Sequence, residues 1–238
     1  MSFSALSLHS QLVNTLAELG YQQPTPIQIE AIPAILAKQD VMAGAQTGTG
    51  KTAAFALPIL QQLLLDNESS DAPKNIRALV LVPTRELAVQ VQQSFVKYAK
   101  GTDIRIGIAY GGVSIEAQQA EFKAGIDVLI ATPGRLLDHL RQGALNLKCL
   151  SVLVFDEADR MLDMGFMDEI KAVLKQVPAQ RQTLLFSATL DDSIFGLSKT
   201  FCVNLSLSKW RNAIPRPHRW SSGFMPSTVT VKPSLSAI

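Results

Sequence analysis

Two short clusters of residues in this 238-residue chain have the types and spacing of phosphate chemistry. The first follows the pattern GxxxxGK[ST] and reads Ala45-Gln46-Thr47-Gly48-Thr49-Gly50-Lys51-Thr52. Ala45 replaces the first glycine of that pattern, but two glycines remain where backbone N–H groups must curve around phosphates. Lys51 would reach the β- and γ-phosphates, and the Thr52 hydroxyl would contact Mg2+. A strand before and a helix after favour a triphosphate-binding loop over a turn with an incidental lysine.

The second cluster is acidic and reads Asp156-Glu157-Ala158-Asp159, directly after the apolar run 150–155. A carboxylate at the end of a buried strand, downstream of a phosphate loop, is the Walker-B arrangement of P-loop nucleoside triphosphatases, with Asp156 holding Mg2+. Glu157 is then placed to orient and deprotonate an attacking water. Read alone, the cluster could also be the acidic first turn of a helix, which is the less favoured alternative. Together with the phosphate loop it predicts a catalytic set of Lys51, Asp156 and Glu157.

Short apolar runs alternate with stretches of helical period, and this alternation must position both clusters. The predicted strands are 41–45, 78–82, 104–109, 128–131, 152–155 and 183–186, and the predicted helices are 52–65, 86–99, 115–122, 135–141 and 168–176. Continuously apolar strands between helices indicate an α/β fold, with a mostly parallel sheet covered by helices on both faces. In such sheets, ligands bind beyond the carboxyl ends of the strands.

Composition limits the remaining classes of protein. The chain is 47% hydrophobic and has a net charge of +2, and Cys149 and Cys202 lack metal-ligand spacing. No signal peptide is evident at the N-terminus, and the longest uncharged apolar window, 52–65, is too short and too broken to span a bilayer. We therefore expect a reduced, cytoplasmic protein with no membrane partner.

The C-terminal residues differ in composition from the rest of the chain. Residues 193–238 carry 6 Lys and Arg but no Asp or Glu, and they hold both tryptophans. Without them the chain is slightly acidic, which excludes a large basic surface for nucleic acid. Four prolines interrupt any regular pattern in this region. We expect residues 201–238 to be a disordered or non-native tail outside the folded domain, which would span residues 1–200.

Several motifs in order give the chain a family resemblance. In addition to the two clusters above, it contains Gly20-Tyr21-Gln22-Gln23-Pro24-Thr25-Pro26-Ile27-Gln28, Pro83-Thr84-Arg85-Glu86-Leu87-Ala88, Gly111-Gly112, Thr132-Pro133-Gly134-Arg135 and Ser187-Ala188-Thr189. The sequence thus resembles the DEAD-box RNA helicases, most of all their bacterial RhlE-like branch. The resemblance covers residues 1–200 and implies a RecA-like P-loop domain, with ATP and Mg2+ as cofactors and RNA as partner.

The resemblance adds residues 1–28, the Q motif, to the ATP site. Gln28 has an amide donor and acceptor that can pair with N6 and N7 of adenine, a combination that guanine does not satisfy. Tyr21 can lie against the base, and Phe3 stands at the spacing of the isolated aromatic residue upstream of this motif. The implied ATP-binding residues are therefore Phe3, Tyr21, Gln28 and the loop 45–52.

The same resemblance assigns three further loops to RNA and one motif to coupling. Arg85 and Arg135 each follow a strand and open a helix, which suits an RNA phosphate, although a solvated arginine beside a helix cap would look the same. The implied RNA-binding residues are Pro83, Thr84, Arg85, Gly111, Gly112, Thr132, Pro133, Gly134 and Arg135. Ser187 and Thr189 are expected to hydrogen-bond Asp159 and so couple hydrolysis to RNA.

The family uses a second RecA-like domain whose arginines complete the site, and no such segment is found in these 238 residues. We therefore predict an ATP-dependent RNA helicase, with a nucleotide-gated RNA-binding fragment of negligible ATPase activity as the alternative. A different P-loop enzyme, such as a DNA translocase or a kinase, is a second alternative. The oligomeric state and the RNA target stay open.

Overall fold

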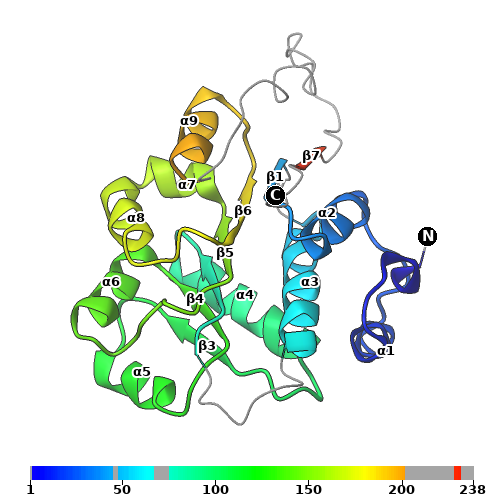
Figure 1. Ribbon diagram of the computed structural model, residues 1–238, viewed down its shortest axis with the longest axis horizontal. Coiled ribbons are helices and arrows are strands. Elements are labelled where there is room, and N and C mark those ends of the chain that lie inside the picture. The colour runs from blue at the N-terminus through cyan, green and yellow to red at the C-terminus, as the bar shows by residue number, and fades with distance from the viewer. Residues whose placement is uncertain (1, 45–47, 67–74, 202–227, 232–238) are drawn as a thin grey trace, which may run out of the picture.

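A computed structural model describes residues 2–44, 48–66, 75–201 and 228–231. Its single sheet has the strand order β3-β4-β2-β5-β6-β1-β7 (Figure 1). The strands are β1 Val41–Gly44, β2 Ala78–Leu81, β3 Ile106–Ala109, β4 Val128–Ala131, β5 Val152–Asp156, β6 Gln182–Ser187 and β7 Thr228–Val231. The first six run parallel, which confirms the predicted α/β class and mostly parallel sheet.

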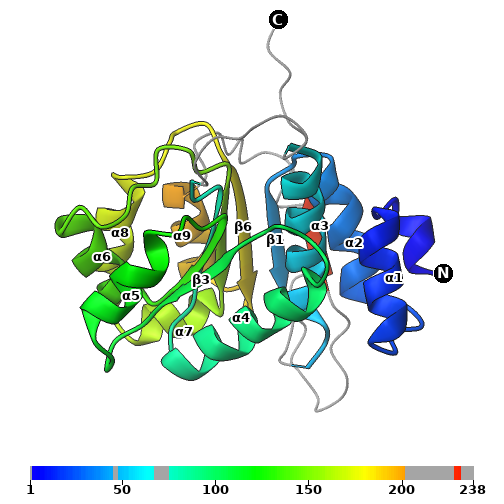
Figure 2. The same cartoon turned by 90° about the horizontal axis from the view of Figure 1, so that it is seen from below.

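Helices cover both faces of this sheet, as the alternating pattern predicts. They are η1 Phe3–Leu6, α1 Ser10–Glu18, α2 Pro26–Leu36, α3 Lys51–Asp66, α4 Arg85–Tyr98, α5 Ile115–Phe122, α6 Pro133–Arg141, α7 Ala158–Asp163, α8 Met167–Leu174 and α9 Asp192–Phe201. The side chains of the first six strands alternate between two apolar clusters: one packs under η1 and α1–α4, and the other under α5–α9 (Figure 2). Such burial of both faces requires the continuously apolar strands seen in the sequence.

The acidic cluster and the phosphate loop meet because the strands that precede them end at the same edge of the sheet. Strand β1 leads into the loop before α3, and β5 ends at Asp156, with only β6 between the two strands. Strands β2, β3 and β4 lead at that same edge into the segments at Thr84, Gly111 and Thr132. Parallel pairing therefore brings together loops that lie more than a hundred residues apart, such as those at Thr52 and Asp156.

Strand β7 differs from the expectation for the C-terminal residues. Thr228–Val231 pairs antiparallel with β1, with Val41 opposite Val231, so these four residues join the sheet. The segment alternates Thr and Val, which favour strands, and it fits between Pro226 and Pro233 without including either. The expectation of a tail outside the fold is wrong for these residues, while 202–227 and 232–238 lie outside the described residues.

None of the helices in the described part of the chain is long and apolar enough to cross a membrane.

Candidate nucleotide-binding site and adjacent loops

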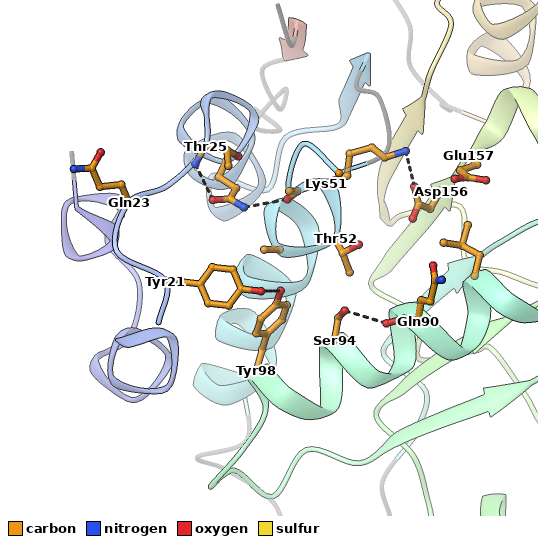
Figure 3. A pocket seen from close by; sticks show the side chains of 15 residues that line it. Tyr21, Gln23, Thr25, Lys51, Thr52, Gln90, Ser94, Tyr98, Asp156 and Glu157 are labelled. Carbon is orange, nitrogen blue, oxygen red and sulfur yellow. Dashed lines mark hydrogen bonds and ion pairs between the residues drawn. The ribbon is translucent and has the colours of Figure 1, made fainter. Parts of the chain in front are cut away.

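A cavity of about 450 Å3 opens at the carboxyl edge of the sheet, between α2, α3, α4 and the end of β5 (Figure 3). This volume falls in the range of small-molecule sites. The cavity is lined by Tyr21, Gln23, Thr25, Gln28, Gly48, Gly50, Lys51, Thr52, Ala53, Leu87, Gln90, Ser94, Tyr98, Asp156 and Glu157. It therefore joins the phosphate loop, the acidic cluster and the Q motif, as the sequence predicts.

The electrostatic centre of this cavity is a buried ion pair between Lys51 and Asp156. Lys51 Nζ lies 3.6 Å from Asp156 Oδ1, and the two side chains are only 7% and 2% exposed. At this distance the contact is an ion pair rather than a hydrogen bond, and Asp156 Oδ1 has no hydrogen-bond partner among the described residues. Both charges are thus buried with incomplete pairing, which is costly unless a ligand completes the site.

The pKa of Asp156 reflects this environment. Burial raises it to about 6, Lys51 opposes the rise, and the neighbouring Glu157 adds to it. Because the folded chain then holds the proton more tightly than the unfolded chain, ionisation of Asp156 costs stability as the pH rises through about 6.

We expect the free energy of unfolding of the metal- and nucleotide-free protein to include a pH-dependent contribution from Asp156. Lowering the pH from about 7.5 to about 5 should add about 1 kcal/mol through this group, and the Asp156→Asn variant should lack that gain. Urea unfolding of both proteins at both pH values, with a chelator present, measures the difference, and titrating groups remote from Asp156 cancel. A difference between the two proteins that does not change with pH would contradict the assignment.

The residues predicted for Mg2+ fit a magnesium site. Thr52 and Asp156 both line the cavity, and the unpartnered Asp156 oxygen supplies the hard ligand that Mg2+ prefers. No group of three or more His, Cys, Asp or Glu gathers into a metal site in the described ranges.

Glu157 lies directly after β5 with a left-handed backbone, at φ 57° and ψ 52°. Such a conformation is strained for a residue with a side chain, and strain of this kind clusters at functional sites. The Glu157 side chain is 16% exposed, and its Oε2 lies 3.3 Å from Nη1 of Arg160, one turn along α7. Because of this left-handed turn, α7 begins only at Ala158, and Glu157 lines the cavity.

Gln28 links the Q motif to the phosphate loop. Its Oε1 accepts a hydrogen bond from the backbone N–H of Thr25 at 2.9 Å, and its Nε2 donates to the carbonyl of Gly50 at 3.1 Å. Gln28 is 2% exposed, so the amide predicted for adenine already has two internal partners. An amide has one further N–H and one further lone pair. Reading adenine and bracing the loop are therefore compatible.

Gly50 cannot be replaced without disturbing that link. Its φ is +89°, and a Cβ atom there would lie 2.5 Å from Gln28 Nε2 and 3.0 Å from Thr25 Oγ1. Gly48 has a similar φ of +85° but no atom within 4 Å of its Cβ position. Replacing Gly48 therefore tests the free-energy cost of the left-handed backbone alone, whereas replacing Gly50 adds the cost of displacing Gln28.

We expect Gly50→Ala to lower the free energy of unfolding more than Gly48→Ala. Both changes cost about 1–2 kcal/mol for the left-handed backbone, and only Gly50→Ala displaces Gln28, which adds about 1 kcal/mol for each hydrogen bond lost. Chemical denaturation without nucleotide measures both variants. Equal losses would show that Gln28 does not hold the loop.

The cavity is also lined by three residues of α4 that were not predicted from the sequence: Gln90, Ser94 and Tyr98. They are spaced four residues apart on one helix face, and this polar and aromatic spacing was the available signal. Tyr98 packs edge-on against Tyr21, with ring centroids 6.1 Å apart and hydroxyl oxygens 3.3 Å apart. Burial, and then the bond to Tyr21, raise the pKa of Tyr98, so it stays a neutral partner that holds Tyr21.

Other residues of the predicted ATP site fall elsewhere. Phe3 is 4% exposed and packs in the apolar cluster under η1 and α1–α4, and it does not line the cavity. The expectation that it contacts ATP is not supported by this position, because burial of the ring against α2 takes it away from the ligand. Thr49 lies between the two lining glycines, and Ala45, Gln46 and Thr47 lie outside the described residues.

The loops predicted for RNA lie together at the same edge. Arg85 is exposed and lies over the Tyr110 ring at 5.0 Å, and Gly112 has its Cβ position 3.5 Å from Arg85 Nη1. Gly111 is also exposed, Pro83 is buried behind the loop, and the Thr84 hydroxyl caps α4 by accepting from Leu87 N at 3.2 Å. The structure therefore places Arg85 and the glycine pair side by side.

The other predicted loop that carries an arginine, from Thr132 to Arg135, does not repeat the arrangement found at Thr84 and Arg85. Thr132 occupies the N-cap of α6 without a side-chain hydrogen bond, and Pro133 is buried behind the exposed edge. Gly134 has open space at its Cβ position. Arg135 is only 13% exposed, so it is neither a solvated cap residue nor a fully free guanidinium. Its RNA-binding role stays a prediction.

The predicted hydrogen bond from Ser187 to Asp159 is not formed. Ser187 ends β6 with a fully buried hydroxyl that has no partner within the described ranges, while Thr189 beyond it is exposed. Asp159 lies in the first turn of α7, directly after the left-handed turn at Glu157. The coupling role of these three residues stays a prediction, and the unpartnered Ser187 hydroxyl is available to form a new contact.

Comparison with known proteins agrees with this geometry. The DEAD/DEAH box helicase family matches residues 25–195. A probable ATP-dependent RNA helicase ddx27 of Dictyostelium discoideum is 47% identical over 199 residues, which is 83% of this chain and 25% of that protein. The ATP-dependent RNA helicase DeaD of Buchnera aphidicola subsp. Schizaphis graminum is 46% identical, over 85% of this chain and 33% of that protein.

A solved DEAD box protein from the hyperthermophile Methanococcus jannaschii superposes with a TM-score of 0.77 at 38% identity, over 84% of this chain and 53% of that one. The chain thus spans a quarter to a third of the length of these two curated relatives. The matched residues contain the phosphate loop, the acidic cluster and the three adjacent loops. The chain belongs to the DEAD/DEAH box helicase family.

Proposed function

We propose that this chain is the ATP- and RNA-binding domain of an ATP-dependent RNA helicase, and that it couples ATP binding and hydrolysis to remodelling of RNA duplexes. The observation that carries this proposal is the buried Lys51–Asp156 pair, which lines a cavity of nucleotide size and whose Asp156 Oδ1 has no hydrogen-bond partner among the described residues. The adjacent exposed Arg85 and glycine pair supply the nucleic-acid side.

Within that function, Lys51 binds the β- and γ-phosphates, and α3 presents its positive N-terminus to them. Thr52 and Asp156 would hold Mg2+, which would neutralise phosphate charge. Glu157 accepts the proton of the attacking water, and its contact with the 57%-exposed Arg160 is weak enough to be released. Tyr21 and Gln28 receive the adenine at the other end of the cavity.

RNA binds along the carboxyl edge through backbone N–H groups and arginines. Arg85 lies at the start of α4, where the helix dipole also favours a phosphate. With few basic residues at this edge, RNA affinity should be weak and strongly dependent on salt. We also propose that the protein is cytoplasmic and RhlE-like, and that a second RecA-like domain supplies the arginine that stabilises the transition state.

The deciding experiment is hydrolysis of ATP by excess protein in a single turnover, with no nucleic acid, with single-stranded RNA and with DNA of the same sequence. We expect RNA, but not DNA, to accelerate hydrolysis, and we expect ATP to bind about 10-fold more tightly than GTP, because guanine fails to match Gln28. A separately added second domain from a relative should raise turnover further.

The alternatives predict different results in the same assay. Equal stimulation by DNA would indicate a DNA translocase. ATP-dependent RNA binding without hydrolysis, even with the second domain added, would indicate a nucleotide-gated RNA-binding fragment. Equal competition by GTP would contradict the adenine-reading role of Gln28.

A further inference from the structure

A buried glutamine on α5, Gln118, contacts all three of the loops at the carboxyl edge, directly or through one residue. Gln118 is 6% exposed, and its Oε1 accepts from Arg135 Nη1 at 3.0 Å and from His139 Nε2 at 2.9 Å. Its Nε2 donates to the backbone carbonyl of Tyr110 at 3.3 Å. The orientation of the amide is therefore fixed, because exchanging its oxygen and nitrogen would set donors against donors.

Through Arg135 this contact reaches the glycine loop. Arg135 Nη1 also donates to the Val113 carbonyl at 3.0 Å, directly after Gly111 and Gly112. On the other side, Tyr110 carries the ring under Arg85, at 5.0 Å from that guanidinium to the ring centroid. One side chain thus connects the loops that present Arg85, the glycine pair and Arg135.

His139 supports Gln118 from the interior. Its ring is fully buried and packs edge-on against Phe122, with centroids 5.0 Å apart. Burial, and then the charge of Arg135, lower the pKa of His139. Since Gln118 Oε1 can only accept, the neutral ring carries its proton on Nε2, and Nδ1 lacks a partner in the described part of the chain. The histidine is therefore a donor committed to Gln118.

We propose that Gln118, supported by His139, is a positioning residue that holds Arg135 and the loop 110–113 as one rigid surface for RNA. The RNA part of this inference rests on the proposed function, whereas the bracing of Arg135 does not. A buried acceptor shared by two donors fixes the guanidinium before RNA arrives, and preorganisation of this kind lowers the entropy lost on binding.

The bracing is tested by side-chain NMR of the arginine guanidinium groups in the full chain without RNA. We expect restrained signals for Arg135 in the unmutated protein, and loss of that restraint in Gln118→Met, which keeps the shape but removes the acceptor. Gln118→Glu keeps an acceptor and should retain the restraint. Gln119→Met is the matched control, because the neighbouring Gln119 bonds Gln142 instead and should leave Arg135 unchanged.

The functional consequence is tested by RNA affinity at low salt, with ATP affinity as the check of the fold in each variant. We expect Gln118→Met to weaken RNA binding about 3- to 10-fold, and to have a smaller effect in the Arg135→Ala background, where only the contacts with Tyr110 and His139 are left to lose. Equal effects in both backgrounds would contradict positioning through Arg135.

Unchanged Arg135 signals in Gln118→Met would overturn the proposal. If that variant does not fold, Gln118→Ala removes the same acceptor without adding bulk, and unchanged Arg135 signals there would overturn it equally. If the unmutated chain binds no RNA, the proposed function fails, and the NMR result still decides whether Gln118 braces Arg135.

Discussion

Replacing Lys51 with alanine should weaken ATP binding by about 30-fold or more, because removing one member of a buried charge pair costs about 2–5 kcal/mol. Lys51 is 7% exposed at the head of α3, and no other lysine lines the described cavity. The change also removes the charge that opposes the rise in the Asp156 pKa, so Asp156 protonates more readily and becomes a poorer ligand for Mg2+. Calorimetric titration with ATP and Mg2+ measures the loss.

Two controls separate this effect from unfolding. Lys175→Ala makes the same change at the C-cap of α8, remote from the cavity, and should bind ATP as the unmutated protein does. Lys51→Gln keeps most of the side-chain length without the charge and should bind as poorly as Lys51→Ala. ATP affinity retained in either Lys51 variant would show that the phosphates bind elsewhere.

The sequence predicts the sheet and the position of the site because both depend on local, strong signals. Each predicted strand appears within a residue or two of its expected bounds, since a fully apolar run between helices has no stable alternative to a buried parallel strand. Because their strands end at the same edge of the sheet, Lys51 and Asp156 then come together without any further signal in the sequence. Their meeting follows from the parallel topology rather than from their spacing in the chain.

The contacts between side chains could not be predicted in the same way. The sequence assigns Gln28 to adenine and Arg135 to RNA, yet both make hydrogen bonds within the protein, to Gly50 and to Val113. Such bonds depend on how helices pack across the sheet, which periodicity does not specify. The same applies to Phe3, whose spacing indicates the Q motif while its burial makes it part of the core.

Strand β7 is an element that was not predicted from the sequence. The unusual composition of residues 193–238 outweighed the short Thr-Val alternation at 228–231, although four β-branched residues are sufficient to pair with an edge strand. Composition averaged over a long segment therefore conceals a short element that tertiary pairing can recruit.

Replacing Glu157 with glutamine should leave ATP binding intact and slow hydrolysis by about 10^2–10^4-fold, the usual contribution of a general base. Glutamine has the same shape and the same tolerance of the left-handed backbone at φ 57°, so the turn after β5 should persist. An amide, however, cannot accept the proton of the attacking water. Single-turnover hydrolysis with RNA present, alongside ATP affinity, measures the two effects separately.

Glu169→Gln provides the matched control for that variant, because it makes the same chemical change in the first turn of α8, away from the cavity. It should hydrolyse ATP at the unmutated rate. If Glu157→Gln were equally active, the proton would have to leave through another group. Among the acidic residues that line the described cavity, only Asp156 would remain, and it is paired with Lys51 and is the proposed ligand of Mg2+. A retained rate would therefore contradict both the base and the assignment of the metal ligand.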